Sequence, residues 1–131
     1  MNKVTIKNLR YSKPKHAWQV RIDRASILGN PYHMSDESQR DKVCEQYEEY
    51  FMENMKYPDT AFYNEVERLY KVFREYGKLE LFCWCAPKRC HAETIKRYLE
   101  KKQPIYDLEE LLGEVQDMIE ERRAIEGSYF Y

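Results

Sequence analysis

Residues 78–101 constrain the fold most, because a buried-strand pattern gives way to a helix pattern across a proline. Apolar side chains occupy both faces of an extended chain at Leu79, Leu81, Phe82, Cys83 and Trp84. We therefore expect a strand in the interior of a sheet, where both faces are covered. Pro87 ends the strand, and Ala92, Ile95 and Leu99 resume at helical spacing. A strand, a polar loop and a helix start form the usual ligand-facing corner of an open α/β sheet.

The rest of the chain supplies further strands and helices. Alternating apolar residues predict strands at 3–8 and 17–23. The residues of the second strand expected to point outward are Gln19, Arg21 and Asp23. Helical spacing predicts helices near 36–55 and 60–76, and a C-terminal helix that begins with a capping box. We predict a single α/β domain over residues 1–131, a small three-layer Rossmann-like sheet of three or four strands flanked by helices.

The charge balance argues against two classes of partner. The 131 residues include 22 basic and 23 acidic side chains, a net charge of −1. This gives no electrostatic reason to expect nucleic acid or an anionic membrane as the main partner. The sequence has no long apolar run and no hydrophobic signal segment, so we expect a cytoplasmic protein. Its four cysteines would then stay reduced, and a disulfide framework is not expected.

Four residues of the zinc-binding types, Cys83, Cys85, Cys90 and His91, lie in one short segment. Thiolate and imidazole groups are the natural ligands of zinc. The spacing argues against a zinc site, because structural sites favour about two to four residues between paired cysteines. We expect no cofactor, with zinc at these four residues as the alternative.

Lys88 and Arg89 precede the predicted helix, which starts near Cys90. Two cations beside the free backbone N–H groups of a helix start suit a phosphate or a carboxylate, although loop cations are also often simply solvated. The same position should lower the pKa of Cys90, a candidate nucleophile with His91 as acid/base. A structural cysteine is the commoner case at such a turn. Trp84 is either a stacking platform or part of the core.

A second polar loop, residues 24–33, also leaves the end of a strand and runs into a helix. Hydrogen-bond donors and an aromatic plane are supplied by Arg24, Ser26, Asn30, Tyr32 and His33. A plain turn would need only Gly29, which permits positive φ, and Pro31. The additional polarity favours a second side of the same ligand site.

In these two loops the chain resembles a family of phage and bacterial domains of unknown function. The motifs that carry the resemblance are Gly-Asn-Pro-Tyr at 29–32 and Cys-x-Cys-x-Pro-x2-Cys-His at 83–91. The resemblance covers about residues 17–101 and implies a phage origin. Leu28 and Ala92 are minor departures from the family pattern.

The two loops and the phage context together predict binding of a small phosphorylated ligand, a nucleotide or an ADP-ribose-like molecule, with sequestration of a host defence signal as the role. The expected ligand-binding residues are Arg24, Ser26, Gly29, Asn30, Tyr32, His33, Trp84, Cys85, Lys88, Arg89, Cys90 and His91. One alternative is an enzyme acting on nucleotides or nucleic acid through Cys90 and His91. Another is an interaction protein stabilised by zinc. The apolar C-terminal helix and aromatic tail, residues 105–131, predict a homodimer.

Overall fold

The computed structural model describes residues 3–102, and the fold and the candidate site lie in one compact unit, Met1–Glu100. The predicted C-terminal helix and aromatic tail, residues 105–131, lie outside the described residues. The prediction of a homodimer rests on that segment and therefore stays a prediction.

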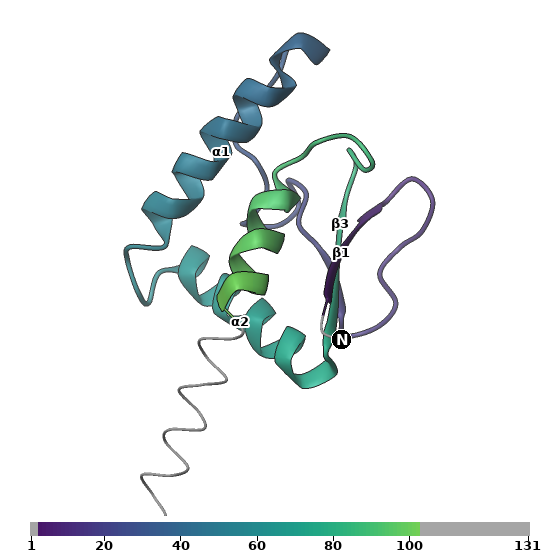
Figure 1. Cartoon of the computed structure of the whole chain (residues 1–131), viewed down its shortest axis with the longest axis vertical. Coiled ribbons are helices and arrows are strands. Elements are labelled where there is room, and N and C mark those ends of the chain that lie inside the picture. Colours follow the sequence, from purple (N-terminus) through teal and green to yellow (C-terminus); the bar gives the residue numbers. More distant parts are fainter. Residues whose placement is uncertain (1–2, 103–131) are drawn as a thin grey trace, which may run out of the picture. The chain divides into compact units, whose positions relative to one another are not determined.

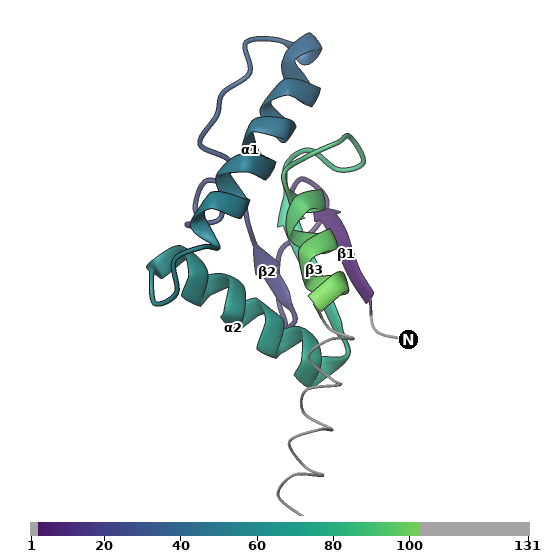
Figure 2. The ribbon, with the colours of Figure 1, turned by 60° about the vertical axis from the view of Figure 1, so that its left-hand side comes forward.

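Three parallel strands form an open sheet in the order β1-β3-β2 (Figures 1 and 2). They are β1 (Lys3–Asn8), β2 (Gln19–Arg21) and β3 (Lys78–Cys83). β3 is central: Val4 of β1 lies opposite Leu79, and Val20 of β2 lies opposite Leu81. This confirms the prediction of an interior strand, whereas β2 is shorter than the predicted strand at 17–23.

The first helical segment begins with the 3-10 turn η1 (Glu37–Gln39) and continues as α1 (Arg40–Asn54). The Asp36 carboxylate caps η1 by accepting a hydrogen bond from the backbone N–H of Ser38. An aspartate in this place satisfies an N–H group that has no partner within the helix. The predicted helix near 36–55 is thus confirmed as two consecutive pieces.

The second helix, α2 (Ala61–Tyr76), has clear boundary residues. The Thr60 hydroxyl accepts a hydrogen bond from the backbone N–H of Tyr63, and Gly77 ends the helix at a φ of 69°. This left-handed conformation suits a residue without a Cβ. A third helix occupies residues 92–102, after β3.

The helices lie on one side of the sheet. Figure 1 looks along the sheet, with α1, α2 and the helix at 92–102 on its left and the connection at 9–18 on its right. The crossovers from β1 to β2 and from β2 to β3 run in opposite directions along the sheet. Right-handed crossovers then place the two connections on opposite faces. This arrangement confirms the prediction of a small Rossmann-like α/β fold.

The core lies between the sheet and the helices. Its fully buried side chains include Val4, Leu79, Leu81, Val66, Leu69, Phe73, Tyr47, Phe51, Ile95 and Leu99. The apolar stripe of α2 is buried along its length, and Cys44 is buried on α1. Parallel sheets are covered in this way because their apolar strands need shielding from water.

Candidate functional site

A cavity of about 390 Å³ lies at the carboxyl ends of the strands. Its lining comes from the two polar loops and the start of α1: Asp23, Arg24, Asn30, Tyr32, Met34, Arg40, Val43, Cys44, Cys83, Trp84, Cys85, Cys90 and His91. The two loops singled out in the sequence therefore face one cavity. This is the edge at which open α/β sheets hold their ligands.

The loop after β3 is held by the end of β1. The Asn8 side-chain amide donates to the carbonyl of Ala86 at 2.7 Å and to that of Trp84 at 3.3 Å. Within the loop, the Lys88 N–H donates to the Cys85 carbonyl at 2.9 Å. These bonds turn the chain back on itself after Cys83, which brings cysteines from both limbs of the loop together.

Three thiols meet at this turn. The sulfur atoms of Cys83 and Cys90 are 3.2 Å apart, and Cys85 contacts both. The Cys85 sulfur also interacts with the Arg40 guanidinium. The contacts with Cys83 and Cys90, and then that with Arg40, hold the pKa of the Cys85 thiol far below its usual range. Among the three thiols, Cys85 is the one that contacts a guanidinium, and this contact favours its deprotonated form.

Cys90 has the opposite character. Only 4% of the residue is exposed, and its contacts with Cys83 and Cys85 and its burial raise the pKa of its thiol. The predicted lowering of this pKa is wrong, because the neighbouring sulfurs outweigh the helix start. If one thiol of the cluster acts as a nucleophile, the geometry favours Cys85.

The start of the helix at 92–102 is already capped by its own residues. The Ala92 N–H donates to the Cys90 sulfur at 3.3 Å, and the Glu93 carboxylate accepts from the Cys90 N–H at 3.2 Å. This is a capping box in which cysteine replaces serine or threonine. These N–H groups are thus already engaged at the place where the sequence suggested an anion.

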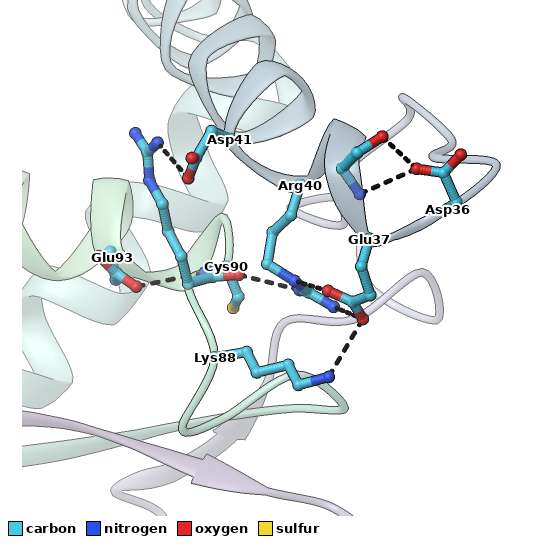
Figure 3. A network of polar contacts seen from close by, with 9 residues as sticks. Asp36, Glu37, Arg40, Asp41, Lys88, Cys90 and Glu93 are labelled. Carbon is cyan, nitrogen blue, oxygen red and sulfur yellow. Dashed lines mark hydrogen bonds and ion pairs between the residues drawn. The ribbon is translucent and has the colours of Figure 1, made fainter.

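Both loop cations are paired with carboxylates near α1 (Figure 3). Lys88 lies 3.2 Å from Glu37, and Arg89 lies 3.0 Å from Asp41. Glu37 also binds Arg40 at 2.8 Å, and these partners, Arg40 first, lower the pKa of Glu37 to about 2. Arg40 in turn donates to the Arg89 carbonyl at 3.0 Å. The network fastens the thiol loop to the start of α1.

His91 is buried and serves as a hydrogen-bond donor. Its Nε2 lies 2.6 Å from the Ile22 carbonyl oxygen, to which it donates, and its ring packs edge-on against Tyr47. Burial lowers the pKa of His91, so the neutral imidazole prevails. The Nδ1 atom lies 3.9 Å from the Cys90 sulfur. His91 thus ties the thiol loop to the segment that follows β2.

The loop at 24–33 uses its motif residues to hold its own shape. A Cβ on Gly29 would lie 2.6 Å from the Asp23 carbonyl oxygen, so close backbone approach requires glycine there. Positive φ in the described residues occurs at Asp59 and Gly77, so Gly29 is needed for this close approach and not for its tolerance of positive φ. The Ser26 hydroxyl accepts from the Leu28 N–H.

Asn30 joins this loop to α1. Its amide donates to the Val43 carbonyl at 3.2 Å, and its side-chain oxygen accepts from the Tyr32 N–H at 2.9 Å. The Asn30 carbonyl accepts from the Arg24 Nε at 3.1 Å. The Asn30 side chain therefore links backbone groups of the loop and of α1, and Asn30 is also part of the cavity lining.

Asp23 is a site residue that the strand pattern misplaces. It was expected to point outward, yet it is buried, because the chain leaves the sheet after Arg21 and the alternation no longer applies. Its carboxylate accepts from the Arg21 guanidinium at 3.1 Å and from the Trp84 Nε1 at 2.8 Å. The Arg21 hydrogen bond is the largest cause of the lowered pKa of Asp23. Asp23 thereby orients the Trp84 ring.

The expected ligand-binding residues fall into two groups. Those lining the cavity are Arg24, Asn30, Tyr32, Trp84, Cys85, Cys90 and His91, and those outside its lining are Ser26, Gly29, His33, Lys88 and Arg89. Sequence reasoning missed Asp23 and Arg40. Arg40 had one available signal, an ion-pair spacing of three residues from Glu37, but this spacing does not point to the thiol loop.

Within residues 3–102, no group of three or more histidine, cysteine, aspartate or glutamate side chains is arranged to hold a metal ion. No helix of the same part of the chain is long and apolar enough to cross a membrane.

Residues 7–101 match the model of a family described as a domain of unknown function, DUF4326. The chain belongs to this family. The matched segment contains the three thiols, both polar loops and Asn8, which holds the thiol loop. It also begins before residue 17, where the resemblance noted in the sequence begins. Comparison with curated proteins finds no match, and comparison with solved structures finds none either.

Proposed function

We propose that this DUF4326 domain binds a small phosphorylated ligand with an aromatic ring, a nucleotide or an ADP-ribose-like molecule, in the cavity at the strand ends. The observation that carries the proposal is the placement of Trp84. Its side chain lines the cavity while the residue is 59% exposed, and its Nε1 is fixed by Asp23. An indole that is both accessible and oriented provides a stacking surface for a base.

Arg24 is the cation best suited to the phosphate. Its side chain donates to the carbonyls of Asn30 and Tyr32, and it has no carboxylate partner within the described residues. Lys88 and Arg89 each already lie in an ion pair with a carboxylate. An arginine whose charge is not compensated, beside a stacking ring, recognises the two halves of a nucleotide.

The cavity suits such a ligand in size and position. A volume of about 390 Å³ lies within the range of small-molecule sites. Tyr32 contributes a second aromatic residue to the lining, and it comes from the other of the two loops than Trp84 does. Arg24, the arginine of the lining that has no carboxylate partner within the described residues, favours an anion over a neutral ligand.

Thermal shift and titration calorimetry with AMP, ADP, ADP-ribose, adenosine and inorganic phosphate test the proposal. A ligand at about 100 times its Kd should add about 2.7 kcal/mol to the stability. Trp84→Ala and Arg24→Gln should each weaken binding about tenfold or more, because each removes about 1–3 kcal/mol of stacking or charged hydrogen bonding. Tyr57→Ala, an exposed aromatic outside the lining, and Lys88→Gln are the matched controls. No shift with any of the phosphorylated compounds would refute the proposal.

We further propose that the ligand is captured unchanged, in keeping with a phage-encoded cytoplasmic protein that sequesters a host defence signal. A second candidate is an enzyme that attacks the ligand with Cys85, favoured by the contact between Cys85 and Arg40. Chromatography of the ligand after long incubation distinguishes the two. Intact ligand supports capture, and a product that disappears in Cys85→Ser supports the enzyme.

The homodimer is proposed on the C-terminal residues alone. Light scattering on the full chain and on a chain ending at Glu126 measures the mass directly. A dimer that dissociates on truncation supports the proposal, and a monomeric full-length chain at micromolar concentration contradicts it.

A further inference from the structure

Three sulfur atoms that line one cavity form a chemical group that ligand binding does not require. The thiols of Cys83, Cys85 and Cys90 contact one another, and all three residues line the cavity. We propose that this cluster is a peroxide-reactive site, in which Cys85 is oxidised first and a neighbouring thiol closes an intrachain disulfide. The proposal is independent of any phosphorylated ligand.

Accessibility identifies Cys85 as the first thiol to react. Cys83 and Cys90 are 1% and 4% exposed, whereas Cys85 is only half-buried. A hydroperoxide entering the cavity would therefore meet the Cys85 sulfur before the other two. Cys85 is also the member of the cluster that contacts the Arg40 guanidinium, and a nearby guanidinium favours the reactive thiolate form.

The charged side chains in the ion pairs around the cluster carry one more positive charge than negative, so they can stabilise one negative charge on sulfur. Glu37 binds both Arg40 and Lys88, so a single carboxylate faces two cations. Arg89 is neutralised separately by Asp41. A thiolate on Cys85 would balance the remaining positive charge of this network, which Figure 3 shows around Glu37.

The resolving thiols are already within reach. The 3.2 Å separation between the sulfurs of Cys83 and Cys90 shows how tightly the group is packed. A disulfide has an S–S distance of about 2 Å, so sulfurs already in contact need only short movements to form the bond. The Cys85 thiol contacts both Cys83 and Cys90, so either neighbour is placed to resolve its oxidised form.

The chemistry balances with a hydroperoxide as the oxidant. The Cys85 thiolate attacks one peroxide oxygen, the O–O bond breaks, and hydroxide leaves, or an alkoxide if the peroxide is organic. Cys85 is then a sulfenic acid. The sulfur of Cys83 or Cys90 attacks the sulfenic sulfur, its thiol proton passes to the departing hydroxyl group, and water leaves as the disulfide forms. The two thiols lose two electrons in total, and the peroxide gains them.

Cys44 provides an internal control. It lines the same cavity and is buried on α1, and burial raises the pKa of its thiol. None of the thiol–thiol hydrogen bonds seen in the described residues involves Cys44. It should therefore remain reduced while the cluster reacts.

The test is oxidation of the reduced, full-length protein with one equivalent of hydrogen peroxide. Alkylation under denaturing conditions and peptide mass spectrometry then follow. We expect a loss of two of the four alkylation sites, a cross-link that contains Cys85, and free Cys44. Cys85→Ser and Arg40→Met should lower the oxidation rate about tenfold or more, because each removes or destabilises the thiolate. Cys44→Ser should react like the wild type.

Two further measurements keep the outcome unambiguous. Dimedone, which traps sulfenic acids, should label Cys85 in the intact wild-type protein at short times after peroxide addition. This measurement does not depend on the folding of any variant. Metal analysis of protein purified without a chelator should find no stoichiometric zinc. Dimedone on another cysteine, a disulfide without Cys85, unreactive thiols or zinc bound to the cluster would each overturn the proposal.

Discussion

The two loops that face the cavity use similar residue types for different purposes. In the loop at 24–33, Gly29 lets the backbone pack closely against Asp23 and Arg24, and Asn30 bonds the loop to α1. The loop at 84–91 is held from outside, by the side chain of Asn8 in β1. The residues Trp84 and Cys85 of this loop therefore remain available to line the cavity. A polar loop motif therefore indicates a site reliably, but it does not indicate which of its residues meet a ligand.

The largest effect should come from Gly29→Ala, which breaks the 24–33 loop at its closest contact. The new Cβ would approach three backbone atoms of Asp23 and Arg24 within 2.8 Å, and backbone cannot move aside as a flexible side chain can. We expect a loss of about 3 kcal/mol in urea denaturation, as for severe overpacking. Gly77→Ala, whose cost comes from its left-handed φ, should lose only about 1 kcal/mol. Equal losses in the two variants would contradict the close-contact explanation.

Asn30→Ala should have the next largest effect, because the hydrogen bonds by which Asn30 joins the loop to α1 are lost. The Val43 carbonyl and the Tyr32 N–H would both lose their partner. The expected loss is about 1–2 kcal/mol, within the usual cost of unsatisfied polar groups. His33→Ala in the same loop is the control, because His33 is exposed and should change stability by less than about 0.5 kcal/mol. Wild-type stability in Asn30→Ala would contradict a structural role for these two hydrogen bonds.

A pH titration sharpens the role of His91, the residue that links the two loops. Its pKa is lowered by burial, so the unfolded chain takes up the proton first as the pH falls. The stabilising contribution is complete above the unfolded-state pKa of about 6.5 and is lost progressively below it. We expect a slope of at most about 1.4 kcal/mol per pH unit from this group between pH 6.5 and 5.

His91→Gln retains a donor for the Ile22 carbonyl but does not titrate, so this part of the slope should disappear. The exposed His33 provides the matched variant, His33→Gln, which should leave the slope intact. An unchanged slope in His91→Gln would show that folding does not shift the pKa of His91.

The smallest effect should come from Lys88→Ala. The Lys88–Glu37 pair is exposed, and exposed pairs contribute little to stability. We expect a denaturation midpoint indistinguishable from that of the wild type, measured beside Lys56→Ala in another exposed pair. A clearly lower midpoint in Lys88→Ala alone would show that the thiol loop depends on the Lys88–Glu37 pair more than the exposure of this pair suggests.

Much of the fold was predictable because its signals are local. The two-faced apolar pattern of β3, the Gly77 stop and the stripe of α2 each depend on neighbouring residues alone. The position of the site was predictable for the same reason, since both loops follow strands. The thiol cluster was not, because it depends on Asn8, which lies 78 residues from its partner Ala86.

The partners of the charged and titratable groups could not be read from the sequence for a similar reason. A lowered pKa was expected for Cys90, the candidate nucleophile of the enzyme alternative, because sequence shows the helix start but not the neighbouring sulfurs. Lys88 and Arg89 were expected to face an anion because their carboxylate partners, Glu37 and Asp41, lie far away in the chain. Asp23 was placed outside because the end of β2 could not be located from alternation alone.

The sulfur-capped helix start gives the molecule a reporter of its own. The Ala92 N–H donates directly to the Cys90 sulfur, so its proton chemical shift depends on the electron density of that atom. In a ¹⁵N-resolved NMR spectrum, a single backbone resonance would then follow the chemical state of the cluster without a label or a dye. The neighbouring Cys90 N–H, held by the Glu93 carboxylate, would serve as its reference within the same turn.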